Sequence, residues 1–365
     1  MKIDAAVTYQ KGTFTLDQVD LDDVKANEVL VKVLASGVCH TDVVARDQDY
    51  PFPLPGILGH EGSGIVEKVG ENVRNLKKGD HVVLSYAVCG QCDNCLTAHP
   101  GGCDHMDDLN FQGKLEDGTT RLHKGNQPIS LFFGQSSFAT YAVANEKNVI
   151  KVDPDVDISL LGPLGCGIAT GSGTVLNFLK PVVGSTIAVY GTGAVGLSAI
   201  MGAKIAGCTK IIAVDIFDHR LDLAKELGAT HAVNSKNMDT VEEIRKITNN
   251  KGTTYAVETT GVPQVFMNAL HALGTRGTLA QVGVSRGPVT LELNMDVMWP
   301  SKTIVGVIEG DAVSKIFIPQ LVEYYKAGQF PFDKLVKFYD FKDIDQAFED
   351  SRTGATIKPI LKMPQ

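Results

Sequence analysis

The chain has 365 residues, of which 44% are hydrophobic and 21% are charged, and this composition excludes a wholly disordered protein. The chain has 34 Lys and Arg and 42 Asp and Glu, which gives a formal net charge of −8. It contains no Lys/Arg-rich run, so nucleic acid is not expected as a partner. No apolar run of 18 residues could cross a membrane, and Met1–Asp4 does not begin like a signal peptide. We therefore expect a cytoplasmic protein of about two domains.

The first 150 residues alternate short β-rich runs with turns. Strands are predicted over residues 29–34, 64–69 and 81–84, because each run is bounded by Gly, Asp or Asn. Residues 50–56 cannot form regular structure, since their alternate prolines fix φ and remove backbone donors. The polar stretch 104–130 is expected to be a surface loop. This half is predicted to be a strand-rich, partly antiparallel body.

From about residue 166 onward, strands and helices alternate. Strands are predicted over 185–190, 210–215, 231–234, 254–258, 277–282 and 303–308, and helices over 194–206, 219–227, 240–248 and 264–273. This alternation predicts an α/β fold with a doubly wound, parallel, six-stranded sheet. After residue 310 we expect one helix over 312–327, bent at Pro319, and short strands near 335–341 and 356–362.

A glycine-rich turn follows the first of these strands. Gly191, Gly193 and Gly196 form a G-x-G-x-x-G pattern that opens a helix, and Asp215 ends the next strand 19 residues after Gly196. Such a turn lets the backbone approach a pyrophosphate, and the helix N-terminus supplies free amides. An acid at the second strand accepts a hydrogen bond from a ribose 2′-hydroxyl and repels a 2′-phosphate. The pattern therefore predicts NAD rather than NADP.

Four of the seven cysteines lie within fifteen residues. Cys89, Cys92, Cys95 and Cys103 have the spacing C-x2-C-x2-C-x7-C, and four thiolates this close can enclose a tetrahedral Zn²⁺ with no open position. An iron–sulfur cluster and a redox relay are the alternatives. The odd number of cysteines argues against a disulfide framework. A structural zinc site is the favoured interpretation.

Three further segments combine cysteine, histidine and acidic residues. Cys39 lies in residues 37–42, His60 and Glu61 lie in residues 59–64, and Cys166 lies in residues 162–171. Taken singly, each has an ordinary structural explanation, because a buried cysteine usually acts as a small hydrophobe. Together with the glycine-rich turn and the four cysteines, they make the chain resemble the zinc-dependent medium-chain alcohol dehydrogenases from Val7 to the C-terminus.

This resemblance implies a catalytic zinc held by Cys39, His60 and Cys166, with a fourth position open to water or substrate. Glu61 would approach the metal from behind these ligands, and Asp42 would orient His60 through its other ring nitrogen. Thr41 would hydrogen-bond the substrate hydroxyl. The expected metal content is two Zn²⁺ per chain. The residues expected to act in catalysis are Cys39, Thr41, His60, Glu61 and Cys166.

The resemblance also implies which residues bind NAD and how the chain is divided into domains. A GroES-like catalytic domain is expected over residues 1–165, with a zinc lobe at 87–105, a Rossmann domain over 166–309, and a return to the catalytic domain over 310–365. His40 and Lys358 would be basic groups on the pyrophosphate. A homo-oligomer is implied, with a tetramer favoured over a dimer. The residues expected to bind the cofactor are His40, Thr170, Gly191, Gly193, Gly196, Asp215, Arg220, Val282, Val307 and Lys358.

Three stretches narrow the resemblance to the aryl-alcohol (benzyl-alcohol) branch: residues 46–55, 132–140 and 307–311. The expected reaction is the reversible, NAD-dependent oxidation of an aromatic primary alcohol to its aldehyde. Phe132 and Phe133 belong to one of these stretches, and they either carry specificity or merely cover the zinc domain. The alternatives are a glutathione-dependent formaldehyde dehydrogenase, a general primary-alcohol dehydrogenase, and a zinc-stabilised nucleotide-binding protein without catalysis. A zinc-ribbon nucleic-acid binder is disfavoured by the charge of −8.

One position departs from the family pattern. Many members carry a histidine three residues after the substrate-binding threonine, where it ends a proton relay to solvent. This chain has Val44 at that position. The relay from Thr41 must therefore end on water or on another base.

Overall fold

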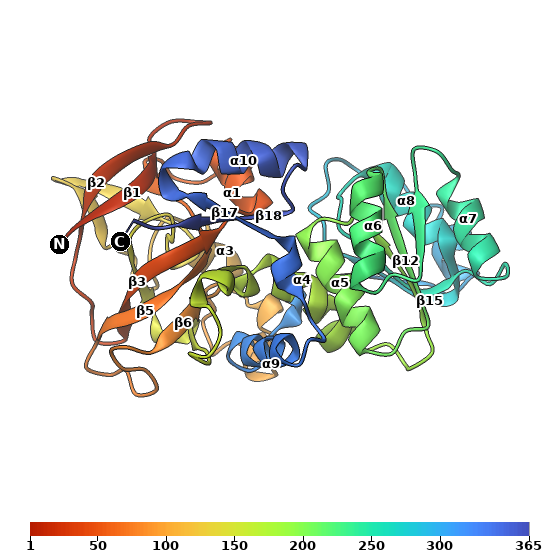
Figure 1. Cartoon of the computed structure of the whole chain (residues 1–365), viewed down its shortest axis with the longest axis horizontal. Helices are drawn as coiled ribbons and strands as arrows, with labels where there is room; N and C mark the ends of the chain where they lie inside the picture. Colours follow the sequence, from red (N-terminus) through yellow and green to blue (C-terminus); the bar gives the residue numbers. More distant parts are fainter. Residues whose placement is uncertain (365) are drawn as a thin grey trace. The chain divides into compact units, whose positions relative to one another are not determined.

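The computed structural model describes residues 1–364, and the chain forms two compact units (Figure 1). The first unit contains Met1–Gly167, Val313–Ala327 and the chain from Phe332 onward. The second contains Ile168–Ala312 and Gly328–Pro331. Within the described residues, no helix combines the length and the apolar character that crossing a bilayer requires.

The first unit is built mainly of strands. A closed barrel has the strand order β1-β2-β7-β8-β4, and a seven-stranded sheet has the order β10-β6-β5-β3-β18-β17, with β9 also pairing with β3. Its helices are α1 (His40–Arg46), α2 (Asp93–Leu96), α3 (Met106–Asn110), α9 (Ser314–Lys326) and α10 (Ile344–Thr353). Its strands are β1 (Lys2–Thr8), β2 (Thr15–Leu21), β3 (Glu28–Gly37), β4 (Gly56–Ile57), β5 (Glu61–Val69), β6 (His81–Leu84), β7 (Leu122–Lys124), β8 (Gln127–Leu131), β9 (Tyr141–Asn145), β10 (Val149–Lys151), β17 (Val336–Asp340) and β18 (Lys358–Lys362).

Strand β3 organises this unit because it pairs with three other strands. Its β-branched residues Val29, Val31 and Val33 are buried, as expected for residues that favour a pleated surface. Antiparallel pairing with β5 places Gly37, at the end of β3, opposite Glu61, at the start of β5. Strand β18 pairs with the same end of β3, with Ile360 opposite Gly37. Three segments far apart in sequence therefore meet at one end of β3.

The second unit is a doubly wound α/β domain, as the sequence predicts. Its six strands are all parallel and have the order β13-β12-β11-β14-β15-β16. In Figure 1, α5 and α6 lie on one side of these strands, and α7 and α8 lie on the other. Its strands are β11 (Thr186–Tyr190), β12 (Lys210–Asp215), β13 (His231–Asn234), β14 (Thr253–Glu258), β15 (Leu273–Gln281) and β16 (Thr303–Gly306). Its helices are α4 (Gly167–Gly173), α5 (Ala194–Ile205), α6 (Asp218–Leu227), α7 (Thr240–Ile247) and α8 (Pro263–Ala272).

The structure differs from the sequence prediction at residues 104–130 and at the end of β16, and it adds helix α10 (Ile344–Thr353), which was not predicted. Residues 104–130 are not only a loop, because they contain α3, β7 and the first part of β8. Strands this short bury few apolar side chains (Leu122, Ile129 and Leu131), so polar neighbours hide the signal. Strand β16 ends at Gly306 rather than at residue 308, and a turn of unusual backbone follows it.

Candidate active site

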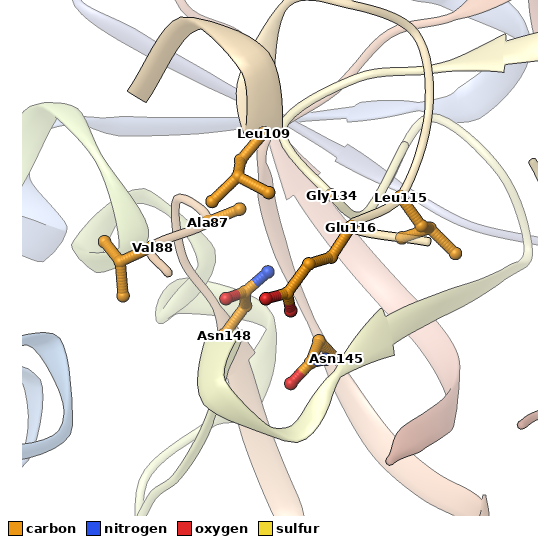
Figure 2. A pocket seen from close by; sticks show the side chains of 8 residues that line it. All are labelled: Ala87, Val88, Leu109, Leu115, Glu116, Gly134, Asn145 and Asn148. Carbon is orange, nitrogen blue, oxygen red and sulfur yellow. The ribbon is translucent and has the colours of Figure 1, made fainter. Parts of the chain in front are cut away.

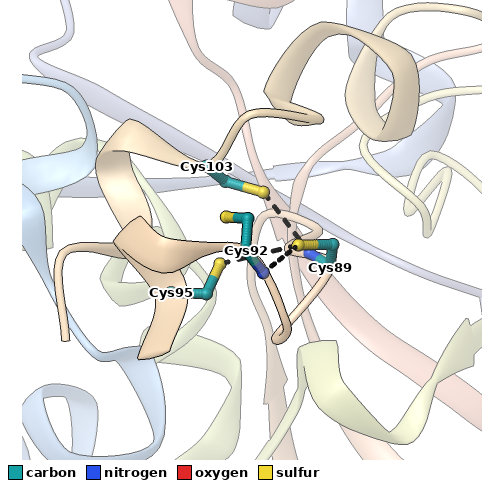
Figure 3. A group of neighbouring side chains, drawn as sticks. All are labelled: Cys89, Cys92, Cys95 and Cys103. Carbon is teal, nitrogen blue, oxygen red and sulfur yellow. Dashed lines mark hydrogen bonds between the residues drawn. The ribbon is translucent and has the colours of Figure 1, made fainter. Parts of the chain in front are cut away.

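The four clustered cysteines converge in the first unit, as the spacing predicts. All four sulfur atoms lie within 4.8 Å of one another, and Figure 3 shows them pointing to a common centre. The Sγ atoms of Cys89 and Cys95 are 3.9 Å apart, and the backbone amide of Cys92 donates to Cys89 Sγ at 3.3 Å. Backbone amides that donate to a sulfur stabilise its thiolate form, which is the form that binds a metal. This donor set fits a tetrahedral zinc with no open position.

The segment that carries these cysteines is short of regular structure. Only α2 and a single 3₁₀ turn, Pro100–Gly102, lie between Cys92 and Cys103. The amide of the Asp104 backbone lowers the pKa of the Cys92 thiol to about 6, and burial raises the pKa of Cys95 to about 12. A metal ion would compensate for such unequal surroundings by binding all four sulfurs as thiolates.

Two cavities lie in the first unit. A cavity of about 20 Å³ lies beside the four-cysteine segment, and Figure 2 shows Leu109, Glu116 and Asn148 among its lining side chains. It has room for about one water molecule. A wider groove of about 780 Å³ runs along β1, β2 and residues 340–342 and 362–364. None of the predicted site residues lines either space.

The second group contains the other predicted metal ligands. Cys39, His60, Glu61 and Cys166 each place one ligand atom within 4.8 Å of the others, although they come from three distant segments. His60 and Glu61 are fully buried, and Cys166 is 7% exposed. The hydrogen bond with Cys166 lowers the pKa of the Cys39 thiol well below its usual value, and burial opposes this shift. The cluster combines two soft sulfurs with one imidazole, which are donors that zinc prefers.

Glycines allow the three segments to approach so closely. A Cβ atom added at Gly37 would lie 2.0 Å from Glu61 Oε2, so only glycine fits opposite Glu61 on β3. Added Cβ atoms at Gly162 and Gly165 would lie 2.2 Å from the Glu61 carbonyl oxygen and 2.1 Å from the Leu84 carbonyl oxygen. The turn that carries Cys166 therefore packs directly on the backbones of β5 and β6.

His60 is held in one orientation. Its Nδ1 atom lies 2.9 Å from Asp42 Oδ1, while its buried Nε2 atom has no hydrogen-bond partner in the described residues. Burial lowers the pKa of His60, but the Asp42 carboxylate outweighs this effect and holds the pKa well above 6.5. When the ring is neutral, as it is when it binds a metal, a carboxylate that accepts from Nδ1 fixes the tautomer in which the lone pair of Nε2 faces the cluster. The unpartnered Nε2 is the atom that a metal would bind.

Asp42 also ties this corner of the cluster together. Its Oδ2 atom accepts from the amide of Cys39 at 3.0 Å, and its Oδ1 atom accepts from the amide of Gly59 at 3.0 Å. One hydrogen bond involves the predicted ligand Cys39, and the other involves Gly59, which directly precedes the predicted ligand His60. The fully buried Asp42 therefore positions two predicted ligands at once.

Lys358 has a partner that the sequence analysis did not anticipate. Its buried ammonium donates to Glu61 Oε1 at 2.8 Å, to Glu61 Oε2 at 2.9 Å and to the Val38 carbonyl at 3.1 Å. These three acceptors use all three of its hydrogens. The expected contact of Lys358 with the pyrophosphate stays a prediction, and in it Lys358 would have to share its hydrogens between Glu61 and a phosphate. Burial raises the pKa of Glu61 to about 7, and the positive charge of Lys358 opposes this shift.

The other predicted residues of the first unit surround the cluster. The Thr41 Oγ1 atom lies 3.7 Å from Cys39 Sγ, and His40 is exposed at the start of α1. Phe132 and Phe133 are buried, and the Phe133 ring lies 4.5 Å from the His60 ring. Of the two interpretations of this aromatic pair, its burial favours a covering role around His60.

The glycine-rich turn of the second unit has the form that a dinucleotide requires. Gly191 has φ of +86° at the end of β11, and Gly193 is the N-cap of α5 without a side-chain cap. A Cβ atom added at Gly193 would meet nothing within 4 Å, so a ligand has free access to the backbone there. At Gly196, an added Cβ would lie 1.8 Å from the Gly191 carbonyl oxygen. Gly191 thus makes the tight turn, Gly193 leaves the backbone accessible, and Gly196 allows close packing against the turn, as in a dinucleotide-binding motif.

Asp215 lies at the end of β12 but already accepts four hydrogen bonds. Its Oδ2 atom accepts from the amide and the hydroxyl of Thr192, each at 2.7 Å. Its Oδ1 atom accepts from the amides of Ile216 and Phe217 at 2.7 and 3.1 Å. A ribose hydroxyl would have to replace the Thr192 hydroxyl. Sequence reasoning missed Thr192, although its place between two glycines of the motif is a usable signal.

The remaining predicted cofactor residues are spread over the second unit. Thr170 lies on α4, where its hydroxyl donates to Glu309 Oε2 at 3.3 Å. Arg220 packs its guanidinium 5.1 Å from the Phe217 ring, and its buried Nε has no hydrogen-bond partner in residues 1–364. Val282 and Val307 follow β15 and β16, and the amide of Val307 donates to the Gln281 carbonyl at 3.0 Å. All four lie near the carboxyl ends of the parallel strands or on α4.

Comparison with known proteins supports the same interpretation. Residues 25–154 match the alcohol dehydrogenase GroES-like domain, and residues 194–324 match the zinc-binding dehydrogenase family. The chain is 43% identical over 362 residues to a geraniol dehydrogenase from Castellaniella defragrans, and the match covers 98% of this chain and 96% of that protein.

Two solved structures are similar over the whole of both chains. A zinc-binding-domain alcohol dehydrogenase protein from Burkholderia ambifaria has a TM-score of 0.97 and 49% identity. The benzyl alcohol dehydrogenase from Acinetobacter calcoaceticus has a TM-score of 0.96, also with 49% identity. The GroES-like barrel, the parallel sheet and the two ligand clusters agree with these similarities. The chain therefore belongs to the zinc-dependent medium-chain alcohol dehydrogenase family.

Proposed function

We propose that this protein is an NAD-dependent dehydrogenase that reversibly oxidises a benzyl-type primary alcohol to its aldehyde. One observation carries the proposal: a Cys39–His60–Cys166 cluster, with His60 and Cys166 buried and Cys39 half-buried, whose imidazole Nε2 has no hydrogen-bond partner among residues 1–364. Three protein ligands and one open position define a catalytic rather than a structural zinc site. The catalytically silent alternative does not explain why the structure orients His60 so completely.

Cys39, His60 and Cys166 would hold the catalytic zinc. When bound, zinc acts as a Lewis acid that lowers the pKa of a hydroxyl group. Asp42 keeps His60 in the metal-binding tautomer and fixes the backbone of Cys39. Lys358 pairs with the buried carboxylate of Glu61, and this pairing would favour a position of Glu61 behind the three ligands.

Thr41 is the group that would receive the alcohol proton. Its hydroxyl lies beside Cys39 Sγ and is half-buried, so it can accept from a substrate hydroxyl and pass the proton outward. Val44 has no proton to exchange, and the relay would therefore end on water. His40 is the neighbouring exposed imidazole and the first alternative.

Gly191, Gly193 and Gly196 would hold the NAD pyrophosphate at the N-terminus of α5, and NAD accepts the hydride. Asp215 would accept from the adenosine ribose after the Thr192 hydroxyl turns away. We expect NAD to be preferred over NADP by at least about a hundredfold in kcat/KM, because a buried acid repels a phosphate. Asp215→Gly should shrink this ratio mainly by weakening NAD, and equal use of both cofactors by the parent protein would contradict the assignment.

Cys89, Cys92, Cys95 and Cys103 would hold the second, structural zinc. We also propose the domain limits of 1–165, 166–309 and 310–365 for the catalytic domain, the NAD domain and the return segment. A homotetramer is the proposed assembly, and size-exclusion chromatography with light scattering would test it.

The substrate assignment draws on two relatives. One solved relative is a benzyl alcohol dehydrogenase and one curated relative is a geraniol dehydrogenase. Benzyl alcohol and geraniol share a primary hydroxyl on a carbon that is bonded to an sp² carbon. Geraniol is therefore the second candidate, and aliphatic alcohols rank lower because they lack this feature.

The decisive experiment is a kcat/KM series with NAD on protein of measured zinc content. Benzyl alcohol, geraniol, hexanol and hydroxymethylglutathione would be compared by the absorbance of NADH. We expect benzyl alcohol to give the highest value and hydroxymethylglutathione the lowest. A maximum for geraniol would move the assignment to allylic alcohols, and a maximum for hydroxymethylglutathione would favour a formaldehyde dehydrogenase. No turnover with any alcohol on zinc-loaded protein would support the catalytically silent alternative.

A further inference from the structure

The turn after β16 has an unusual backbone. Glu309, Gly310 and Asp311 have φ values of +50°, +63° and +48°, so three consecutive residues occupy the left-handed region and two of them are not glycine. Such conformations cost about 1–3 kcal/mol for each non-glycine residue, and they cluster at ligand sites where the surroundings hold them in place. The strain therefore points to a function for this turn.

The second unit holds this turn rigidly against α4. A Cβ atom added at Gly310 would lie 2.5 Å from the Ala169 carbonyl oxygen and 3.0 Å from the Thr170 carbonyl oxygen. Next to these residues, a Cβ added at Gly171 would lie 1.9 Å from the Val195 carbonyl oxygen, in the first turn of α5. The turn, α4 and the phosphate-binding end of α5 are thus in direct backbone contact.

This packing places one carboxylate at a defined point. The Thr170 hydroxyl donates to Glu309 Oε2 at 3.3 Å, and Glu309 is half-buried. Thr170 is one of the residues that we propose to contact the cofactor. The hydrogen bond therefore holds the Glu309 carboxylate beside Thr170 on α4.

The strand order shows which half of a bound dinucleotide would lie near Glu309. In a doubly wound sheet, the cofactor lies across the carboxyl ends of the strands, with one mononucleotide over each half. Asp215 follows β12 and marks the adenosine half, and the glycine-rich turn follows β11 at the centre. Glu309 follows β16, in the half that contains β14, β15 and β16. The nicotinamide belongs to this half.

We propose that the Glu309 carboxylate lies beside the nicotinamide and favours its oxidised, cationic form over the neutral reduced form. The inference deepens the proposed function and rests on it. The oxidised ring carries a positive charge that hydride transfer removes, so a nearby carboxylate stabilises only NAD⁺. The site would then release NADH more readily than it releases NAD⁺.

The test measures Kd for three ligands on the full chain: NAD⁺, NADH and ADP-ribose, which lacks the nicotinamide. For Glu309→Gln, we expect the ratio of Kd for NAD⁺ to Kd for NADH to rise about five- to twentyfold, the size of a partly screened charge pair. The affinity for ADP-ribose should stay within about twofold of the parent. Titration of NADH fluorescence, with NAD⁺ and ADP-ribose as competitors, gives all three constants without turnover.

Two further variants control for the strained backbone. Asp311→Asn removes a carboxylate from the same turn and should leave the ratio unchanged, and Glu309→Asp keeps the charge and should restore most of the preference for NAD⁺. If Glu309→Gln weakens NAD⁺, NADH and ADP-ribose equally, or if it leaves the ratio unchanged, Glu309 does not select the oxidised ring. A parent protein that binds none of the three ligands would overturn the proposed function together with this inference.

Discussion

The two ligand clusters of the first unit are built in opposite ways. The four cysteines come from one stretch of fifteen residues with little regular structure, and all their donors are sulfurs. Cys39, His60 and Cys166 come from three distant segments, and the paired strands β3 and β5 hold two of these segments together. We therefore expect the first group to depend on a metal for its stability, whereas paired strands arrange the second.

The surroundings of the two clusters follow the same division. Asp42 makes hydrogen bonds to both the His60 ring and the Cys39 backbone, and Gly37 lets Glu61 approach at the end of β3. The four-cysteine segment has mainly its own backbone amides as donors to sulfur. Loss of metal should therefore reduce stability at the four-cysteine cluster and reduce catalytic activity at the Cys39–His60–Cys166 cluster.

The largest difference should come from Cys166→Ala. We expect kcat/KM to fall at least about a thousandfold, because the Lewis acid at this site contributes several kcal/mol to the reaction. The zinc content should fall from two to one per chain, with little change in melting temperature. Cys208→Ala is the matched control, since Cys208 is buried but belongs to neither cluster. A Cys166→Ala protein that keeps two zinc ions would show that the ligand set is wrong.

Cys103→Ser should lower the stability of the protein and leave its catalytic activity largely unchanged, which is the reverse of the effect expected for Cys166→Ala. We expect a loss of about 3–5 kcal/mol in the free energy of unfolding, because a structural zinc contributes folding energy directly. Denaturant unfolding measures this loss, and elemental analysis should again find one zinc. The kcat/KM of the folded fraction should remain close to that of the parent. Unchanged stability with two bound zinc ions would remove the structural role of this cluster.

Asp42→Asn tests whether the fold really orients the second cluster. An amide in place of the carboxylate weakens the bond to His60 Nδ1, and such changes cost about 10- to 100-fold in metal affinity or activity. Competition with a chelator and kcat/KM with benzyl alcohol measure the two effects. Asp49→Asn, an exposed position on the same segment, should leave both values unchanged. Equal values for the two variants would mean that metal binding alone orders His60.

The smallest expected effect concerns the attachment of the four-cysteine segment. Lys147 donates to the Cys89 carbonyl at 2.8 Å and forms an ion pair with Glu116 at 3.1 Å, although 39% of its side chain is exposed. We expect Lys147→Met to lower the free energy of unfolding by only about 0.5–1 kcal/mol, without changing kcat/KM. A loss as large as that for Cys103→Ser would show that outside contacts, rather than the metal, order this segment.

Local patterns explain which parts of the fold could be predicted. The parallel sheet follows from buried strands that alternate with helices, and its six strands appear as expected. Strands β7 and β8 were not predicted, because short strands with few buried residues have no clear periodicity. Helix α10 was also missed, although its buried residues Ile344, Ala347 and Phe348 have helical spacing. The four-cysteine cluster could be predicted from its spacing alone, since its ligands are neighbours in sequence.

By itself, the sequence determined the ligand types, the glycine-rich turn and the succession of strands and helices, because these depend on residues close together in the chain. Only the tertiary structure decided which side chains meet across long separations. It placed Lys358 on Glu61, 297 residues away, and it packed Phe133 on His60. It also bound Thr192 to Asp215 and pressed Gly310 onto α4. Such contacts depend on strand register and on backbone approach within a packed interior, and neither leaves a periodic signal in the sequence.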